Sequence, residues 1–349
     1  MPPSIVLILA FALLAARPLS AEPLPALGAD PSRITVSGLS SGAYMAGQFQ
    51  VAYSQLVNGA ALVAGGPYAC AHTPGTDLNP FWPVVLTWNL TRAQNKCMED
   101  GWFFSSVPSP ATLFEYAGEL AARGAIDPVS GLAGDKVYLF SSEADDRIET
   151  GVVEAAAGFY REAGVPEANI RFEKHETAAH AFLTEADAPA CGTTGAPYLN
   201  DCDIDQAKAI LEWLTGPLQP AGSADAQSFA RFEQAPYADD PGAASLGDEG
   251  IVYVPRSCRT QPGCALHVVF HGCKQGLAAI GDRFVTGAGY ARWAESNAIV
   301  LVFPQAAASA FNPDGCWDWW GYTGPRFLER GAPQMLAVKR MLDRLATRP

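Results

Sequence analysis

The sequence is poor in positive charge and in histidine. Its 349 residues include 23 Lys and Arg against 36 Asp and Glu, which gives a formal net charge of −13, and only five histidines. It contains no cluster of basic residues. Because nucleic-acid binding depends on Lys and Arg that neutralise phosphates, this composition argues against a nucleic-acid partner. The chain also has no internal repeat, heptad array or phosphate-binding loop.

The sequence also lacks a hydrophobic run long enough to span a bilayer, which takes roughly 20 apolar residues. The apolar segment Ile5 to Ala16 is shorter and is followed by small residues at Ser20-Ala21. This pattern is typical of a secretion signal over residues 1–21, although no Lys or Arg precedes it and Leu19 is not the usual small residue. We predict a secreted protein, periplasmic or extracellular, without stable membrane insertion; an uncleaved anchor is the alternative.

The most informative segment is Gly38-Leu39-Ser40-Ser41-Gly42. It follows the β-branched run Ile34-Thr35-Val36 and precedes an amphipathic stretch, Ala43 to Leu56, so strand, sharp turn and helix are predicted in succession. This is the context of a nucleophile elbow, in which glycines flank a serine held in a strained backbone conformation. Ser40 is therefore the candidate nucleophile, and a tight structural turn is the alternative.

A nucleophilic serine needs a base and an orienting carboxylate. The stretch from Lys136 to Ser141 reads as a buried strand and leads into a loop with Asp145 and Asp146. A triad acid just past a strand end, with an apolar residue three positions on, fits Asp145 best. Asp146 is the second choice, and two solvated loop aspartates are the alternative.

Two histidines follow the next expected strand, Ile170 to Lys174. His180, framed by small residues, is the candidate general base, and His175 is interpreted as a structural histidine at the strand end. A zinc site is not predicted, because a separation of five residues on a helix would turn the two rings roughly 500° apart.

The marker of an oxyanion loop, His271-Gly272-Cys273, lies far downstream of the serine. It follows a buried strand, Leu266 to Phe270, and precedes a helical stretch, Gly287 to Asn297, and another strand, Ala298 to Phe303. Read cyclically from Cys273, the order becomes oxyanion loop, nucleophile, acid and base. We therefore predict an α/β fold, a circularly permuted α/β hydrolase with a mostly parallel central sheet that draws strands from both halves of the chain.

Four segments together resemble the permuted poly(3-hydroxybutyrate) depolymerases. They are Gly38-Leu39-Ser40-Ser41-Gly42-Ala43-Tyr44-Met45, Ala179-His180-Ala181-Phe182, His271-Gly272-Cys273-Lys274-Gln275 and Asn312-Pro313-Asp314-Gly315-Cys316-Trp317-Asp318-Trp319-Trp320. The resemblance covers nearly the whole mature chain, from about Ser32 to Asp343.

The resemblance implies a serine esterase that hydrolyses poly(3-hydroxybutyrate) or related polyhydroxyalkanoates through an acyl-enzyme to monomers or oligomers. It implies nucleophile Ser40, acid Asp145, base His180, and backbone N–H donors from Ser41 and Cys273. Where the family pattern has glycine two or three residues before the acid, this chain has Ser142-Glu143, which leaves Asp145 and Asp146 both open.

Residues 22–349 are expected to form a single catalytic domain. The segment 215–250 is rich in Pro, Gly, Ala, Ser and Asp and would be the junction of the permutation. Within and after it, Ser228 to Gln234 and Gly250 to Val254 are expected to form a hairpin at the sheet edge.

Eight cysteines, an even number, fit an oxidising compartment. Sequence proximity favours Cys191 with Cys202 and Cys258 with Cys264. A bond between Cys70 and Cys97 would brace the segment after the elbow helix, which leaves Cys273 with Cys316, although the sequence does not fix the connectivity. The last pair would hold the oxyanion loop in place.

No cofactor or metal is expected. Asp201, Asp203, Asp205 and Glu212 have the spacing of a calcium loop, but Gln206 stands where that loop requires glycine. Acids at a helix N-terminus explain these residues more simply.

Aromatic residues indicate which segments contact the substrate. Trp317, beside Cys316, is predicted to contact substrate, and Phe81-Trp82 and Trp102-Phe103-Phe104 offer further apolar surface. The expected partner is a hydrophobic polyester surface bound by a monomer. The alternatives are a feruloyl or acetyl-xylan type esterase, a general short-chain carboxylesterase, and a catalytically silent polymer-binding protein on the same fold.

Overall fold

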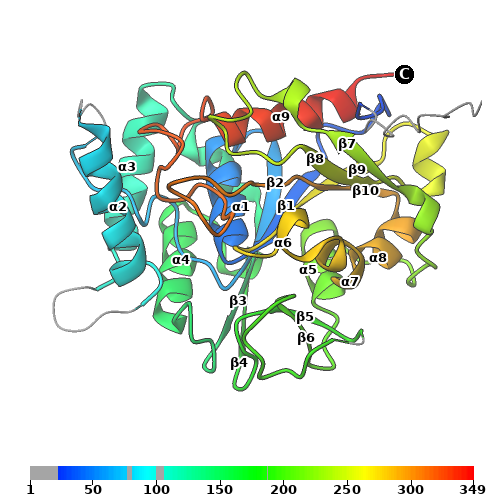
Figure 1. Cartoon of the computed structure of the whole chain (residues 1–349), viewed down its shortest axis with the longest axis horizontal. Coiled ribbons are helices and arrows are strands. Elements are labelled where there is room, and N and C mark those ends of the chain that lie inside the picture. Colours follow the sequence, from blue (N-terminus) through cyan, green and yellow to red (C-terminus); the bar gives the residue numbers. More distant parts are fainter. Residues whose placement is uncertain (1–22, 77–80, 100–105, 187) are drawn as a thin grey trace, which may run out of the picture.

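The computed structural model describes residues 23–76, 81–99, 106–186 and 188–349. An eight-stranded sheet forms its centre, in the order β4-β3-β2-β1-β9-β10-β8-β7 (Figure 1). Its strands are β1 (Ile34–Leu39), β2 (Val57–Val63), β3 (Lys136–Ser142), β4 (Ile170–His175), β7 (Phe229–Glu233), β8 (Glu249–Tyr253), β9 (Ala265–Phe270) and β10 (Ile299–Phe303). A separate small sheet pairs β5 (Phe182–Thr184) with β6 (Leu199–Asp201).

The α-helices lie between and around these strands. They are α1 (Ser41–Ala52), α2 (Trp82–Lys96), α3 (Pro110–Ala122), α4 (Thr150–Glu162), α5 (Gln206–Thr215), α6 (Leu277–Ile280), α7 (Arg283–Gly287), α8 (Tyr290–Asn297) and α9 (Pro333–Ala346). Short 3₁₀ helices cover Val129–Gly134, Glu167–Asn169, Ala226–Ser228, Ala235–Tyr237 and Arg256–Arg259.

The strand directions confirm a mostly parallel α/β sheet. From β4 to β10 every neighbouring pair is parallel, whereas β8 runs antiparallel to both β10 and β7. The central strands β1, β9 and β10 are buried at every position. Parallel strands covered on both faces need such continuous apolar runs, which is why Ile299–Phe303 reads Ile-Val-Leu-Val-Phe.

Helices cover both faces of the sheet. Helix α1 packs on β1, β2 and β9, while α5 packs on β1, β2 and β3 and against α8. Figure 1 shows α1 and α5 on opposite sides of the sheet. The central strand β1 is therefore enclosed between helices on both faces.

The two halves of the chain meet in this sheet, as predicted. Strand β1 pairs in parallel with β9, and Gly38 lies opposite Phe270. Because residues that follow paired positions stay close together, the turn after β1 and the loop after β9 share one end of the sheet. The strand order fits a circularly permuted hydrolase, but the permutation itself stays a prediction.

The expected hairpin is also present, with β7 at the sheet edge and antiparallel to β8.

Two expected helices have other bounds in the structure. The helix expected from Ala43 to Leu56 begins and ends earlier, at Ser41–Ala52. The helix expected from Gly287 to Asn297 begins only at Tyr290, because Gly289, with φ 85°, separates it from α7. The predicted signal, 1–21, and Trp102-Phe103-Phe104 lie outside the described residues.

The predicted cysteine pairs are confirmed. Disulfides join Cys70 to Cys97, Cys191 to Cys202, Cys258 to Cys264, and Cys273 to Cys316. Four disulfides are typical of a protein that folds in an oxidising compartment and indicate secretion. No helix within the described ranges combines the length and apolar character that a membrane crossing requires.

Candidate active site

Ser40 occupies a sharp turn between β1 and α1. Its φ is 57° and its ψ is −120°, a conformation that costs a non-glycine residue about 1–3 kcal/mol. A Cβ at Gly38 would lie 2.2 Å from the carbonyl oxygen of Gly42, and one at Gly42 would lie 2.3 Å from that of Phe270. Only glycine fits at these two positions, and the turn has the geometry of a nucleophile elbow.

The structure brings His180 and Asp145 together. The Nδ1 atom of His180 lies 2.9 Å from Oδ2 and 3.0 Å from Oδ1 of Asp145, and both side chains are more than 90% buried. Since a carboxylate only accepts, Nδ1 carries the hydrogen and Nε2 is left to accept a proton. The Oδ1 atom of Asp145 also accepts the backbone N–H groups of Arg147 and Ile148 at 2.8 and 3.0 Å.

The neighbouring candidates lie elsewhere. Asp146 is 56% exposed and accepts a hydrogen bond from the hydroxyl of Thr194. His175 ends β4, and its Nδ1 accepts the backbone N–H groups of Thr177 and Ala178 at 3.1 and 2.9 Å. Of the two aspartates, Asp145 is thus the one in contact with His180, while His175 stabilises the turn before it.

The amides of Ser41 and Cys273 flank the serine on the two joined halves of the chain. Among the described residues, neither N–H donates a hydrogen bond to another group. Ser41 is buried and Cys273 is partly buried. The two amides can donate to an oxygen bound at this place.

Several contacts hold the loop after β9, residues 271–276. The buried His271 donates from Nδ1 to the carbonyl of Gly272, at 2.8 Å, and accepts at Nε2 from the N–H of Ala306, at 3.1 Å. Burial lowers the pKa of His271 to about 4, so the ring is neutral and its tautomer is fixed. The Cys273–Cys316 disulfide adds a covalent tether to the same loop.

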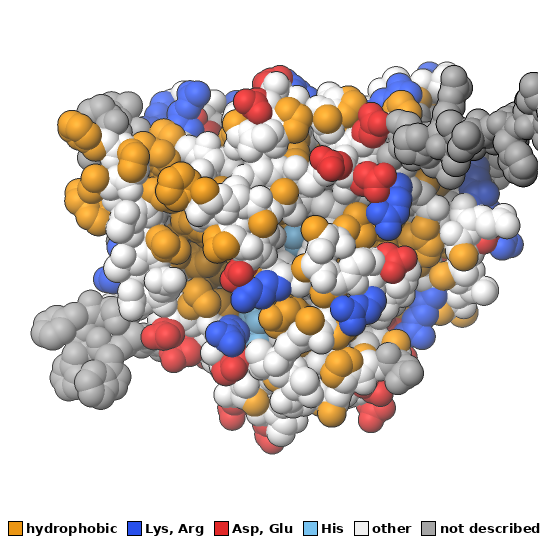
Figure 2. Space-filling view, viewed as in Figure 1, with side chains coloured by type: hydrophobic (Ala, Val, Ile, Leu, Met, Phe, Trp, Pro, Cys, Tyr) orange, Lys and Arg blue, Asp and Glu red, His pale blue; other side chains and the backbone are white. Residues whose placement is uncertain are grey.

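A cavity of about 180 Å³ connects these groups, and it is lined by Ser40, His180 and Cys273 together with Tyr198. Three charged residues, Arg147, Lys274 and Asp314, line it as well, as does Met98. Figure 2 shows histidine atoms near the centre of this face, with basic side chains beside them and apolar side chains extending over the region of α2.

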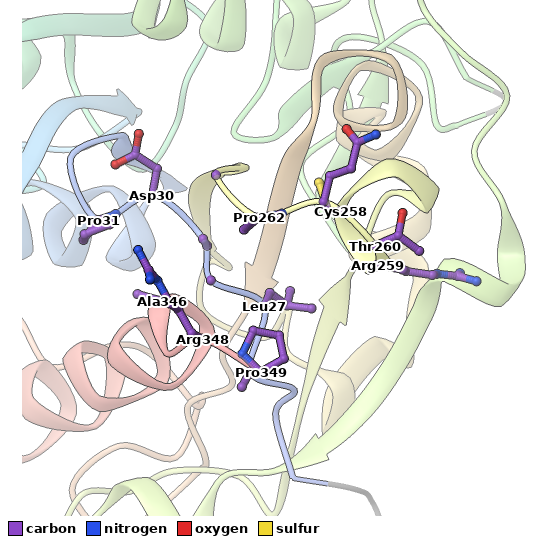
Figure 3. A pocket seen from close by; sticks show the side chains of 15 residues that line it. Leu27, Asp30, Pro31, Cys258, Arg259, Thr260, Pro262, Ala346, Arg348 and Pro349 are labelled. Atoms are coloured by element: carbon purple, nitrogen blue, oxygen red, sulfur yellow. The ribbon is translucent and has the colours of Figure 1, made fainter.

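A larger cavity, of about 820 Å³, lies away from this site (Figure 3). It is formed where the segment 26–31 meets the loop 258–263 and the end of the chain, with Arg348 and Asp30 among its lining. None of its lining residues is one of the candidate catalytic residues. Its volume alone does not make it the active site.

The structure does not bring Trp317 to the cavity. Its side chain is fully buried and packs edge-on against Phe270, with ring centroids 5.0 Å apart. Its backbone N–H donates to the Oγ of Ser41 at 3.3 Å. The indole ring packs in the apolar core and is not exposed to solvent, so the predicted substrate contact of Trp317 has no support here. The residue instead contacts the first residue of the helix that follows Ser40.

Asp205, one of the acids with calcium-loop spacing, has other partners. Asp205 is the N-cap of α5 and accepts from the N–H of Lys208 at 3.0 Å and from Nε1 of Trp293 at 2.7 Å, and it also pairs with Arg292. In the part of the chain that the structure describes, no group of three or more His, Cys, Asp or Glu side chains is arranged to hold a metal ion.

The charged lining of the cavity, Arg147, Lys274 and Asp314, is not predicted from the sequence. Gln275 does not line the cavity but belongs to the His-Gly-Cys-Lys-Gln segment, and the sequence assigns it no role either. Arg147 follows Asp145 closely and Lys274 follows Cys273, so proximity to the candidate residues was the available signal.

Three features define a serine hydrolase of the α/β class. They are a mostly parallel α/β sheet, a serine on a strained elbow, and a buried Asp-His pair at the same strand ends.

No protein-family model matches the chain. Two curated relatives are similar to it. A poly(3-hydroxybutyrate) depolymerase of Delftia acidovorans is 39% identical over 329 residues, which are 93% of this chain and 62% of the relative, so the chain spans less than two thirds of that protein.

A polyhydroxybutyrate depolymerase of Talaromyces funiculosus is 32% identical over 346 residues, 93% of each chain. Two solved structures are similar as well, each with a TM-score of 0.80, 30% identity and coverage of 93% of this chain and 98% of the other. One is a PHB depolymerase complexed with an R3HB trimer, and the other is the PHB depolymerase from Penicillium funiculosum. The chain belongs to the polyhydroxybutyrate depolymerase family.

Proposed function

We propose that this protein is a secreted serine esterase that hydrolyses poly(3-hydroxybutyrate) or a related polyhydroxyalkanoate to 3-hydroxyacid monomers and oligomers. The observation that carries the proposal is the convergence of Ser40, His180 and Cys273 on one cavity, with Asp145 bonded to the histidine. Family membership supplies the substrate class, since the relatives from Delftia acidovorans and Talaromyces funiculosus are named for it.

The chemistry is a two-step acyl transfer. His180 accepts the hydroxyl proton at Nε2 while Oγ of Ser40 attacks the ester carbonyl carbon, and Asp145 stabilises the imidazolium that forms. The resulting oxyanion accepts hydrogen bonds from the N–H groups of Ser41 and Cys273, of which each is typically worth about 3–4 kcal/mol. His180 then protonates the leaving alcohol, the acyl C–O bond breaks, and water activated by the same histidine releases the acyl group.

The surface of α2 supports a polymeric, uncharged substrate. Val84 is 46% exposed and Trp88 is 49% exposed, and Phe81 and Leu90 are exposed beside them. From Phe81 to Thr91 the chain carries no charged residue. Apolar side chains extend from this helix toward the centre of the face in Figure 2. An exposed apolar patch of this kind is expected where a protein adsorbs to a hydrophobic surface.

The remaining expectations belong to the same proposal. Residues 22–349 form one catalytic domain that acts as a monomer, residues 1–21 direct its export, and no cofactor takes part. The single sheet built from both halves of the chain and the four disulfides support the domain assignment and export, respectively.

The test is hydrolysis of a turbid suspension of amorphous poly(3-hydroxybutyrate), with products identified by mass spectrometry. We expect the turbidity to fall and 3-hydroxybutyrate or its short oligomers to appear. Release of ferulate or acetate from plant polysaccharide, without any loss of polyester turbidity, would instead identify a carbohydrate esterase. Hydrolysis of soluble nitrophenyl esters alone would identify a general short-chain esterase.

A further inference from the structure

Two cations line the cavity although a neutral polyester chain does not require them. Arg147 and Lys274 both lie at its wall with Ser40 and His180, and each side chain is 57% exposed. Within a polyhydroxyalkanoate chain the ester groups are uncharged. The anionic group of such a molecule is the carboxylate at its end, which is also the group that every hydrolysis product carries.

Both cations are attached to segments that build the site. The backbone N–H of Arg147 donates to Oδ1 of Asp145 at 2.8 Å, so this residue is held directly beside the candidate triad acid. Lys274 follows Cys273, has φ 59°, and its N–H donates to the carbonyl of Asp314 at 2.7 Å. The backbone from which each cationic side chain extends is therefore fixed relative to the candidate acid and the loop that carries Cys273.

Existing ion pairs do not saturate these cations. Arg147 approaches Asp146 only to 3.6 Å, and that carboxylate is 56% exposed. Lys274 lies 3.2 Å from Asp314, which is 47% exposed. Exposed pairs of this kind contribute about 0–1 kcal/mol, so a substrate carboxylate can compete for either cation. The protein's net charge of −13 opposes this little, because distant charges are screened beyond about 8 Å at physiological ionic strength.

We propose that Arg147 and Lys274 bind the terminal carboxylate of the substrate and favour cleavage close to the carboxyl end of the chain. This inference rests on the proposed function and specifies which substrate molecules the site prefers. The acyl C–O bond breaks, His180 supplies the proton to the departing oxygen, and the alcohol that leaves is a 3-hydroxyacid whose carboxylate contacts the cations. Free-acid oligomers and chain ends are thus better substrates than internal esters.

The experiment compares kcat/KM for the trimer of 3-hydroxybutyrate as free acid and as its methyl ester. We expect wild type to prefer the free acid by about fivefold at low salt, which corresponds to one partly exposed ion pair of about 1 kcal/mol. The preference should fall toward unity in 0.5 M NaCl, as screening of exposed charges requires. Arg147→Gln and Lys274→Gln should each reduce it by lowering kcat/KM for the free acid more than kcat/KM for the methyl ester, and Arg147→Lys should retain it.

The matched control is Arg326→Gln, because Arg326 is 76% exposed and does not line this cavity. It should leave the preference unchanged. Equal rates of wild type on acid and ester, or an equal loss on both substrates in Arg147→Gln, would overturn the inference while leaving the esterase function intact. If wild type clears the polymer suspension but hydrolyses neither trimer, this inference fails alone. If it neither clears the suspension nor hydrolyses a trimer, the proposed function fails as well.

Discussion

The side-chain amide of Gln275 donates to the backbone carbonyl of Tyr198 at 3.0 Å. The same carbonyl accepts the N–H of Phe182, two residues after His180, at 2.9 Å. At its other end Gln275 accepts the N–H of Gly272 at 2.7 Å. One buried side chain thus ties the loop that carries the Cys273 amide to the loop that carries the candidate base, although these loops are about ninety residues apart in the sequence.

Replacement of Gln275 should therefore affect rate more than binding. In Gln275→Ala the two loops lose their common brace, and we expect kcat to fall by about 10- to 100-fold with KM changed little, a smaller loss than removal of an oxyanion donor itself. Gln275→Glu keeps the acceptor for Gly272 but cannot donate to Tyr198 when ionised, so it should be impaired as well. Steady-state kinetics on a soluble ester measure both parameters. Unchanged kcat in a folded Gln275→Ala protein would show that the brace has no catalytic role.

The Cys273–Cys316 disulfide should support both stability and rate. It joins residues 43 positions apart, for which loop-closure entropy predicts up to about 4 kcal/mol of stability. The paired Cys273→Ser and Cys316→Ser variant should unfold at a lower temperature and lose turnover. The matched control removes the Cys258–Cys264 disulfide. Its two cysteines are only 6 positions apart in the sequence, and neither lines the candidate site. Kinetics at a temperature where both variants are folded should show a loss of turnover only in the first.

Replacement of Asp145 should lower kcat far more than replacement of the adjacent Asp146. In Asp145→Asn the amide oxygen can keep the backbone N–H groups of Arg147 and Ile148, which leaves the NH2 group to donate to Nδ1 of His180 and favours the wrong tautomer. The negative charge is also lost, and we expect kcat to fall by about 10⁴-fold. Asp146→Asn should stay within about twofold of wild type, because its carboxylate is exposed and contacts the solvated side chain of Arg147. Turnover of a soluble ester by the two purified variants measures this difference. A large loss in Asp146→Asn with little loss in Asp145→Asn would reverse the assignment.

A buried carboxyl makes stability depend on pH. Asp135 accepts a hydrogen bond from Nε2 of Gln50 at 2.8 Å, and burial raises the pKa of Asp135 from 3.8 to about 7. The folded protein therefore holds this proton more tightly than the unfolded chain does. The contribution of Asp135 to the free energy of unfolding is on the order of 4 kcal/mol at most. This contribution is fully present below about pH 4 and is lost as the pH rises toward 7.

Asp135→Asn removes this titration while it keeps an oxygen that accepts from Gln50. We expect the variant to be more stable than wild type at pH 8, with a smaller or no gain at pH 4. Urea denaturation at both pH values measures the difference, with the exposed Asp248→Asn as control. A gain that is the same at both pH values would mean that Asp135 does not titrate as described.

Much of the fold could be read from local pattern. Apolar, β-branched runs such as Leu266 to Phe270 identify the buried strands, and glycines around Ser40 identify the elbow, because those positions leave no room for a Cβ. The sequence also indicated that two distant segments meet, and the pairing of β1 with β9 confirms it.

The remainder depends on contacts between distant residues. The pattern favours Asp145 over Asp146 but leaves both open. In the structure Asp145 is the one that contacts His180, and the backbone N–H groups of Arg147 and Ile148 also donate to its carboxylate. The neighbourhood of Trp317 suggests an exposed loop, yet its ring is enclosed by Phe270 and His271. Burial of this kind follows from packing across the sheet and not from local composition.

Release of 3-hydroxybutyrate from polymer by Ser40→Ala bears most directly on the proposed mechanism. Alanine at φ 57° is strained as serine is, so the variant should keep the wild-type fold, which circular dichroism and thermal unfolding can verify. We predict that product release falls by about 10⁴-fold or more, with adsorption to polymer granules retained. Product release by a folded Ser40→Ala protein at a rate near that of wild type would contradict the assignment of Ser40 as the nucleophile.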